Sequence, residues 1–180
     1  MKKLNILLLT TITGCMLTSF TYYEDWYVFE DNSCKINFPA KAENDSSVID
    51  SQIGKLTVFT HMYSAPGSKS DSNLVYGLIE TEYPEDYIKL NTKELEEHFF
   101  KGAVTGVLNK VNGKLISEKE INIGKYPGRE ILVDYPERAV IIKMRFFIER
   151  NKLFALQTIS NAGKEKNTNS SRFMNSFELK

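Results

Sequence analysis

The sequence has few of the residues on which most enzymes and metal sites depend. Its 180 residues include only two cysteines and two histidines. His61 and His98 lie too far apart for a paired-histidine motif, and a zinc site needs three or four ligands. The sequence has no G-x-S-x-G motif, no phosphate-binding glycine loop and no dinucleotide fingerprint. We therefore expect no catalytic residue, no metal and no cofactor, and a protein that is not an enzyme.

An excess of charge of either sign is also missing. The 23 lysines and arginines balance the 23 aspartates and glutamates. Proteins that bind nucleic acids usually carry a basic face, so we expect no nucleic-acid partner. With 42% hydrophobic and 26% charged residues, the composition is that of an ordinary globular protein rather than a disordered or fibrous one.

The sequence lacks an uninterrupted apolar run of the length that a membrane-spanning helix needs, about 18 residues. Its most apolar stretch is short and lies at the start, where Lys2 and Lys3 precede a series of leucines and isoleucines. A basic start followed by a short apolar run is typical of a secretory signal. The run ends at Ile12-Thr13-Gly14-Cys15, which resembles a bacterial lipobox, the site where a cysteine is lipidated and becomes the mature N-terminus.

This resemblance implies that residues 1–14 are a lipoprotein signal peptide and that Cys15 is lipidated. Residues 15–25 would form a tether, and residues 26–180 a single α+β domain. The lipid would attach the protein to a membrane, which places it in the cell envelope, facing the periplasm or exterior. Two alternatives stay open. One is an ordinary secretory signal, for which Thr18-Ser19-Phe20 is a poor cleavage site, and the other is an uncleaved anchor.

The mature chain has enough residues for one domain with a sizeable core, since removal of the signal leaves 166. It loses Lys2 and Lys3 and has a net charge of −2. Cys34 is then the only cysteine besides Cys15, so we expect no disulfide within the chain. Apolar residues alternate around Cys34, which favours a buried, inert thiol over a reactive one.

Alternation of apolar and polar residues predicts a succession of short strands, separated by turn-forming residues. Ile53-Gly54 marks a hairpin, and the polar run 41–47 separates the second strand from the third. The predicted strands are residues 26–29, 33–38, 48–52, 55–63, 74–83, 115–123, 129–135, 139–149 and 153–160. The last four are expected to form an antiparallel meander.

One long helix is predicted over residues 92–110. Asn91 is the expected cap, and Glu94 completes a capping box. A short C-terminal helix is expected to end at Arg172-Phe173-Met174. Strands, a long helix, more strands and a final helix predict an α+β layered domain built on an antiparallel β-sheet.

The long helix carries a wide apolar stripe, in which Leu95, Phe99 and Ala103 recur every four residues. Such a stripe is typical of a helix that packs on a sheet. Gly102 and Gly106 lower helix stability by about 1 kcal/mol each, and we expect them to allow close packing on the sheet.

Several short motifs resemble those of small bacterial domains with a Mog1/PsbP-like fold. They are Ile36-Asn37-Phe38-Pro39, Gly124-Lys125-Tyr126-Pro127-Gly128-Arg129-Glu130, Arg145-Phe146-Phe147, Asn151-Lys152-Leu153-Phe154-Ala155-Leu156 and Arg172-Phe173-Met174-Asn175-Ser176-Phe177. The resemblance covers about residues 34–179 and implies a Mog1/PsbP-like layered sandwich with no catalytic residues to carry over. Members of this broad fold include a Ran-binding protein, an extrinsic photosystem II subunit and bacterial periplasmic lipoproteins, so the fold alone does not fix a function.

Tyr126, Arg129 and Arg145 are the candidate residues for a ligand or partner surface. One interpretation is that they line a groove for an anionic ligand. The other, which we favour, is structural: Arg129 either pairs with a carboxylate of a neighbouring strand, for which Glu149 is the candidate, or extends its side chain along the sheet. Pro127 and Gly128 have the order that a type II turn requires.

The sequence as a whole favours a non-enzymatic, lipid-anchored cell-envelope protein that acts as a binding or assembly module for another envelope component. The alternatives are a periplasmic small-ligand carrier and a hydrolase of unrecognised type. An acidic group that includes Glu80, Glu82 and Glu85 leaves cation binding open, although a solvated strand end is the favoured interpretation. Neither the partner nor the ligand is specified by these residues.

Overall fold

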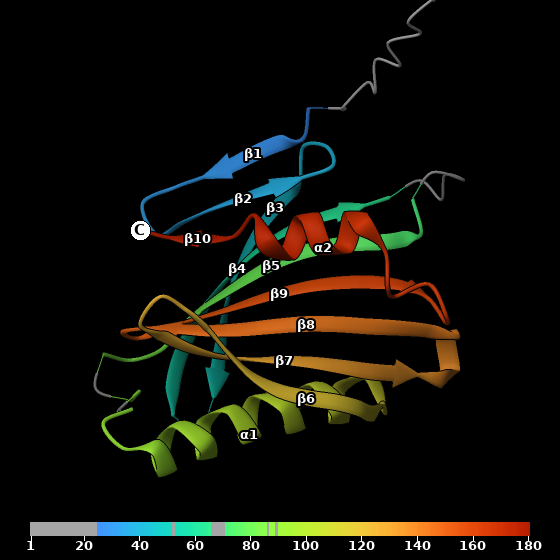
Figure 1. Cartoon of the computed structure of the whole chain (residues 1–180). Coiled ribbons are helices and arrows are strands. Elements are labelled where there is room, and N and C mark those ends of the chain that lie inside the picture. Colours follow the sequence, from blue (N-terminus) through green and yellow to red (C-terminus); the bar gives the residue numbers. More distant parts are fainter. Residues whose placement is uncertain (1–24, 52, 66–70, 86, 89) are drawn as a thin grey trace, which may run out of the picture.

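A twisted sheet of antiparallel strands divides the molecule into two layers (Figure 1). The structure, a computed structural model, describes residues 25–51, 53–65, 71–85, 87–88 and 90–180. The predicted signal peptide (1–14) and nearly all of the predicted tether (15–25) lie outside these residues. The strands of the described ranges are β1 (Tyr27–Glu30), β2 (Cys34–Phe38), β3 (Glu43–Ser51), β4 (Gly54–Ser64), β5 (Asn73–Glu82), β6 (Lys114–Ile123), β7 (Tyr126–Tyr135), β8 (Val140–Glu149), β9 (Lys152–Asn161) and β10 (Glu178–Leu179). The helices are α1 (Lys93–Val111), the 3-10 turn η1 (Pro136–Arg138) and α2 (Thr168–Asn175).

Seven of the described strands form one sheet, called here the large sheet, in the order β3-β4-β5-β9-β8-β7-β6. β1, β2 and β10 form the small sheet. α1 covers one face of the large sheet, while α2 and the small sheet cover the other (Figure 1). The predicted α+β fold is therefore confirmed, with its antiparallel sheet, its long helix, its short C-terminal helix and the meander from β6 to β9.

The large sheet buries apolar side chains on both faces. Successive side chains of a strand point to opposite faces. Phe146 of β8 therefore lies in the core beneath α1, while its neighbour Phe147 lies in the core beneath α2 and the small sheet. Both side chains are 2% exposed. Because β8 contributes to two cores, seven of its ten residues are apolar.

The long helix begins at Lys93, one residue later than predicted. Thr92, and not Asn91, caps it, because the Thr92 hydroxyl accepts a hydrogen bond from the Leu95 amide at 3.3 Å. Leu95 occupies the position that a glutamate would need, so the predicted capping box with Glu94 does not form. Within the part of the chain that the structure describes, no helix combines the length and the hydropathy needed to span a membrane.

Only part of the predicted apolar stripe of α1 reaches the sheet. Phe100 and Val104 are buried there, whereas Leu95 is 44% exposed. Gly102 and Gly106 face open space, since a Cβ atom at either position would meet no atom within 4 Å. The prediction that these glycines allow close packing on the sheet was wrong, because the helix rests on Phe100 and Val104 instead.

Two strands begin three or more residues earlier than predicted. β3 starts at Glu43, although every residue in it is exposed. As an edge strand held by backbone pairing with β4, it needs no apolar alternation. β7 starts at Tyr126, so Pro127 and Gly128 lie inside the strand and not in the predicted type II turn. The chain turns at Gly124, which has a φ of 55°.

Gly128 is required by a close approach of neighbouring atoms. A Cβ atom there would lie 2.4 Å from the carbonyl oxygen of Phe146 and 2.6 Å from the Cδ1 atom of Phe147. Both separations are far below van der Waals contact, and the nearer atom belongs to the backbone. β7 and β8 could accommodate a side chain at this position only by moving apart.

We expect Gly128→Ala to lower the free energy of unfolding by about 2 kcal/mol or more, because the added methyl group overlaps the backbone of β8. Gly102→Ala is the matched control, since it makes the same change in open space on a helix and should raise stability by up to about 1 kcal/mol. Urea unfolding followed by far-ultraviolet circular dichroism measures both. Similar effects of the two substitutions would contradict the close approach at Gly128.

Candidate functional site

The structure divides the three predicted surface residues between the two faces of the large sheet. Arg129 of β7 is in register with Phe146, on the face beneath α1. Arg145 of β8 is in register with Glu130, on the opposite face. Tyr126 shares that opposite face with Arg145. A single groove lined by all three side chains is therefore not formed.

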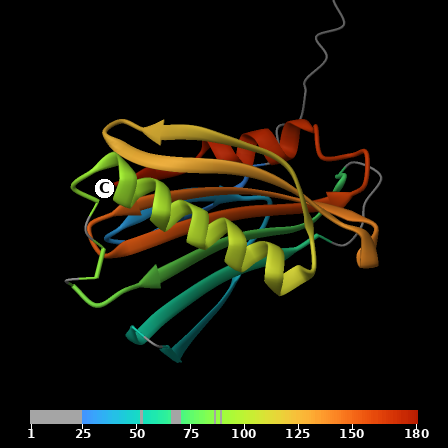
Figure 2. The same cartoon turned by 90° about the horizontal axis from the view of Figure 1, so that it is seen from below.

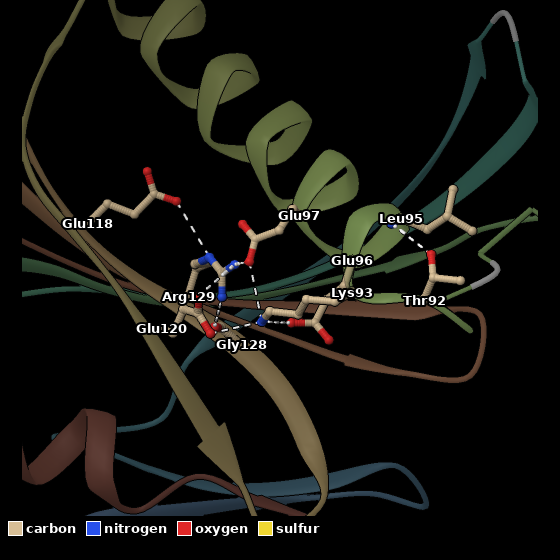
Figure 3. Close-up of polar contacts among 9 residues, drawn as sticks. All are labelled: Thr92, Lys93, Leu95, Glu96, Glu97, Glu118, Glu120, Gly128 and Arg129. Atoms are coloured by element: carbon tan, nitrogen blue, oxygen red, sulfur yellow. Dashed lines mark hydrogen bonds and ion pairs between the residues drawn. The ribbon is translucent and has the colours of Figure 1, made fainter.

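Arg129 is a buried cation beneath the first turns of α1 (Figure 3). It is only 2% exposed. Its Nη2 atom lies 2.5 Å from Glu97 Oε1 and 3.8 Å from Glu120 Oε1, and its Nε atom lies 3.6 Å from Glu118 Oε1. Its Nη1 atom donates a hydrogen bond of 3.1 Å to the Gly128 carbonyl. The guanidinium is thus held by carboxylates from α1 and β6.

Lys93 completes this group, called here the Arg129 network (Lys93, Glu96, Glu97, Glu118, Glu120 and Arg129; Figure 3). Its Nζ atom lies 2.8 Å from Glu96, 3.3 Å from Glu97 and 2.8 Å from Glu120. The oxygens of these three glutamates are spaced closely enough to hold a metal ion, but the Lys93 ammonium lies among them and supplies the positive charge. The network contains two cations and four carboxylates, so it is unsuited to an anionic ligand.

The charges of the Arg129 network act on the titration of its members. The hydrogen bond from Arg129 holds the pKa of the Glu97 carboxyl below its usual range, and Lys93 acts in the same direction. The predicted partner of Arg129, Glu149, instead accepts a hydrogen bond of 3.0 Å from the Tyr126 hydroxyl. Arg129 therefore joins α1 and β6 to β7. The interpretation that Arg129 pairs with a carboxylate of a neighbouring strand is correct, but its partners are Glu118 and Glu120 of β6 and Glu97 of α1, not Glu149.

Arg145 connects α2 to the large sheet. Its Nε atom donates to Glu130 at 2.6 Å, and its Nη1 atom donates to the Met174 carbonyl at 3.1 Å and to Asn175 Oδ1 at 2.9 Å. Burial raises the pKa of the Glu130 carboxyl, but hydrogen bonds from Lys119 and Arg145 outweigh this effect and hold the pKa below its usual range. Like Arg129, Arg145 is occupied by contacts within the protein.

An apolar groove runs along the flank of α1 that faces β4 and β5, away from the Arg129 network. Its volume is about 780 Å³. The aromatic side chains of Tyr83, Tyr87 and Phe99 form part of its wall. Its lining consists of Ile53, Leu56, Tyr83, Tyr87, Leu90, Leu95, His98, Phe99, Gly102, Ala103, Gly106, Val107, Lys110, Phe146 and Leu153. We call it the α1 groove.

The three aromatic side chains of the wall, Tyr83, Tyr87 and Phe99, contact one another. Tyr83 stacks on Tyr87 with centroids 5.6 Å apart and planes 6° apart, and it meets Phe99 edge to face at 5.6 Å. Burial raises the pKa of the Tyr83 hydroxyl. The described lining includes neither a carboxylate nor a serine or cysteine nucleophile. The groove is therefore suited to binding an apolar surface.

The groove exists because α1 leaves one end of the large sheet uncovered. In Figure 2, α1 crosses the sheet diagonally and the ends of β3 and β4 extend beyond it. Gly102 and Gly106 lie on the groove side of the helix, where the lack of side chains keeps the space open. Leu95 and these two glycines were a partial signal of the groove in the sequence. The groove itself could not be recognised, because Leu56, Phe146 and Leu153, which complete its lining, lie on strands distant from α1 in the sequence.

We expect Arg129→Met to lower the free energy of unfolding by about 2 kcal/mol at neutral pH. The substitution removes the ion pair with Glu97 and the hydrogen bond to Gly128, and it leaves closely spaced carboxylates behind. Arg138→Met is the matched control at an exposed position and should change stability by no more than about 0.5 kcal/mol. Urea unfolding measures both, and equal losses would contradict the role of Arg129.

The loss caused by Arg129→Met should also depend on pH. A carboxyl whose pKa is lower in the folded than in the unfolded state adds stability above its unfolded value, here 4.5, and loses it as the pH falls through the folded value. The stability difference between the parent and Arg129→Met should therefore shrink as the pH is lowered below about 4.5. A difference that stays constant into acid would show that Glu97 contributes nothing to it.

Comparisons with known proteins identify the fold. No family model matches the chain, and no curated protein matches its sequence. The solution structure of the cyanobacterial PsbP protein, CyanoP, from Synechocystis sp. PCC 6803 is similar at a TM-score of 0.53 and 13% identity, covering 89% of this chain and 96% of that one. A Pseudomonas aeruginosa protein of unknown function, described as a putative regulator, has a TM-score of 0.40 and 11% identity over 78% of this chain and 85% of its own. The likeness to CyanoP shows that this chain has a PsbP-like fold.

Proposed function

We propose that this protein is a non-enzymatic, lipid-anchored protein of the cell envelope that binds a partner protein of the envelope through the α1 groove. The observation that carries the proposal is the groove itself, an open apolar surface of about 780 Å³ beside an exposed helix. Its described lining offers no paired nucleophile and base. Apolar grooves of this kind commonly accept an amphipathic helix of a partner.

The shape of α1 favours a helical occupant. The groove follows α1 from Leu95 to Lys110, about 22 Å at the rise of an α-helix, which matches four turns of a second helix. Gly102 and Gly106 lie one turn apart, and nothing lies within 4 Å of where their Cβ atoms would be. The backbone of a partner helix can therefore approach α1 closely at this point. Leu95 and Tyr87, which are 44% and 46% exposed, would be buried by it.

The proposed lipid anchor rests on the lipobox-like Ile12-Thr13-Gly14-Cys15. A single lipid chain binds membranes weakly, whereas several chains give a stable anchor. The described chain starts beside β1, which lies on the opposite side of the large sheet from α1 (Figure 1). A domain tethered through the residues before β1 would therefore present the α1 groove away from the attachment point, where a partner has access to it.

A small-ligand carrier is the second candidate, because the groove volume falls in the range of small-molecule pockets, about 300–1,000 Å³. The two candidates differ in what occupies the groove. If the groove binds a partner helix, cross-linking from the groove would give a covalent protein adduct. If the protein is a carrier, extraction would release a bound small apolar molecule.

Lipidation predicts a specific mature mass. We expect the membrane-extracted protein to begin at Cys15 and to carry added acyl mass, while Cys15→Ala should retain the signal and lack that mass. Intact-protein mass spectrometry of the two forms checks this. A protein cleaved elsewhere and recovered in the soluble fraction would contradict the lipid anchor and leave the groove proposal standing.

Filling the groove should abolish partner binding without harming the fold. We expect Gly106→Leu to be tolerated, because its side chain enters open space, and to reduce recovery of the partner at least about 10-fold. Thr105→Leu is the matched control, since Thr105 is exposed and lies outside the groove lining. Recovery is measured by photo-cross-linking in cells from a reactive residue placed at Leu95.

A stoichiometric protein adduct that Gly106→Leu removes and Thr105→Leu keeps would support the proposal. An adduct that survives Gly106→Leu would overturn it. Absence of any adduct, together with a small apolar molecule extracted from the parent but not from Gly106→Leu, would replace it by the carrier.

A further inference from the structure

A second group of chemically active side chains lies on the other face of the large sheet. Asp31 lies in the turn between β1 and β2, Cys34 begins β2, His61 lies on β4 and Glu80 on β5. Packing of the small sheet on the large sheet brings these four residues together, and we call them the Cys34 cluster. Cys34 is fully buried, and Glu80 and His61 are only 3% and 8% exposed. The favoured interpretation of Glu80 as part of a solvated strand end was therefore wrong.

The Glu80 carboxyl lies at the centre of the cluster. Its Oε1 atom is 3.9 Å from Cys34 Sγ and 3.7 Å from His61 Nε2. Donor atoms of Asp31, Cys34 and Glu80 all lie within 4.8 Å of one another. The Glu80–His61 contact is longer than an ordinary hydrogen bond of about 2.7–3.2 Å. The almost completely buried Glu80 carboxyl thus has a thiol and an imidazole as neighbours, at separations of 3.9 and 3.7 Å.

His61 is oriented so that one ring nitrogen faces this carboxyl. Its Nδ1 atom lies 2.8 Å from Asn44 Oδ1. Because an amide oxygen only accepts hydrogen bonds, Nδ1 donates to Asn44, and Nε2 is the ring nitrogen on the side of Glu80. Phe29 covers the ring, with centroids 4.0 Å apart. Metal-binding histidines are typically fixed in this way by a hydrogen bond to their other nitrogen.

We propose that Asp31, Cys34, His61 and Glu80 form a binding site for a zinc ion. In tetrahedral geometry, bond lengths of about 2.0 Å to nitrogen and oxygen and about 2.3 Å to sulfur place the ligand atoms about 3.3–3.5 Å apart. The separations of 3.7 and 3.9 Å around Glu80 exceed this by a few tenths of an ångström. The donor atoms of Asp31, Cys34 and Glu80 lie within 4.8 Å of one another, whereas His61 lies outside that group and would move toward the ion as the fourth ligand. The combination of a thiolate, an imidazole and carboxylates favours zinc over magnesium or calcium, which prefer oxygen ligands alone.

The arrangement points to a structural role for the ion. Four protein ligands and deep burial are typical of closed zinc sites, in which no position stays open for a substrate. The ligands join the β1–β2 turn to β4 and β5, so the ion would clamp the small sheet onto the large sheet. Asp31 is partly exposed and offers the ion a route from solvent. This inference is independent of the proposed function, because the cluster and the α1 groove lie on opposite faces.

Zinc binding also requires the Cys34 thiol to lose its proton. Burial, together with the charges of Glu80 and Asp31, raises the pKa of this thiol well above its usual range. Binding of one ion replaces that proton, so about one proton should be released per ion at neutral pH.

Titration of the full chain with Co²⁺ provides the test. The protein titrated carries the substitution Cys15→Ser, so that Cys34 is its only thiol. We expect one equivalent of Co²⁺ to produce the intense near-ultraviolet absorption of a cobalt–thiolate bond and the visible bands of tetrahedral cobalt. One equivalent of Zn²⁺ should abolish both. Absence of the thiolate band at stoichiometric cobalt overturns the proposal, and this outcome needs no variant.

Variants assign the ligands. Cys34→Ser should remove the thiolate band and weaken Zn²⁺ binding by at least about 100-fold, and Asn44→Ala should weaken it by about 10- to 100-fold by releasing His61. His98→Gln is the matched control, because His98 lies on α1 beside the groove, and it should bind as the parent does. Unchanged affinity in Cys34→Ser would show an adventitious surface ion and overturn the proposal. Circular dichroism without metal confirms that each variant is folded, and His61→Gln replaces Cys34→Ser if the latter is not.

Discussion

The burial of apolar side chains on both faces of the large sheet is the constraint on which the rest of this structure depends. β8 and β9 supply residues to two cores at once, and neither core is closed by the sheet alone. Each face therefore needs a covering layer. α1 supplies it on one side, and α2 with the small sheet supplies it on the other. The helices and the terminal strands are positioned by this requirement.

Incomplete coverage of one face accounts for the α1 groove. α1 is fixed toward the β7 side of the sheet by two contacts that reinforce each other. Phe100 is fully buried, and the Arg129 guanidinium lies 5.0 Å from its ring centroid while also pairing with Glu97 of the same helix. Because α1 is held at this side, β3 and β4 extend beyond it, and Leu56 and Tyr83 line an open surface instead of a closed core. The Arg129 network thus fixes the position of α1 on the large sheet, and the α1 groove is the part of this face that α1 does not cover.

The two faces of the large sheet carry different chemistry. The α1 face offers an apolar groove with tyrosines and glycines, suited to a partner's apolar surface. The opposite face holds the polar Cys34 cluster between the two sheets. In a tethered protein, a clamp between the small and large sheets would stabilise the part of the domain that is nearest the anchor. The groove would stay on the side available to a partner.

The sequence by itself determined the class of fold, because alternation along strands and the four-residue repeat of α1 are local properties. It also predicted most element boundaries. The exceptions are β3, an exposed edge strand that has no apolar alternation, and the start of β7, where Pro127 and Gly128 lie in the strand instead of a turn. The partners that Arg129 and Arg145 have within the protein could not be predicted, since ion pairs depend on which strands and helices lie side by side. Glu80, Cys34 and His61 looked unrelated for the same reason. Only the tertiary structure decided which face each side chain occupies, where α1 leaves the sheet uncovered and which donors meet, because these depend on packing between elements that are distant in the chain.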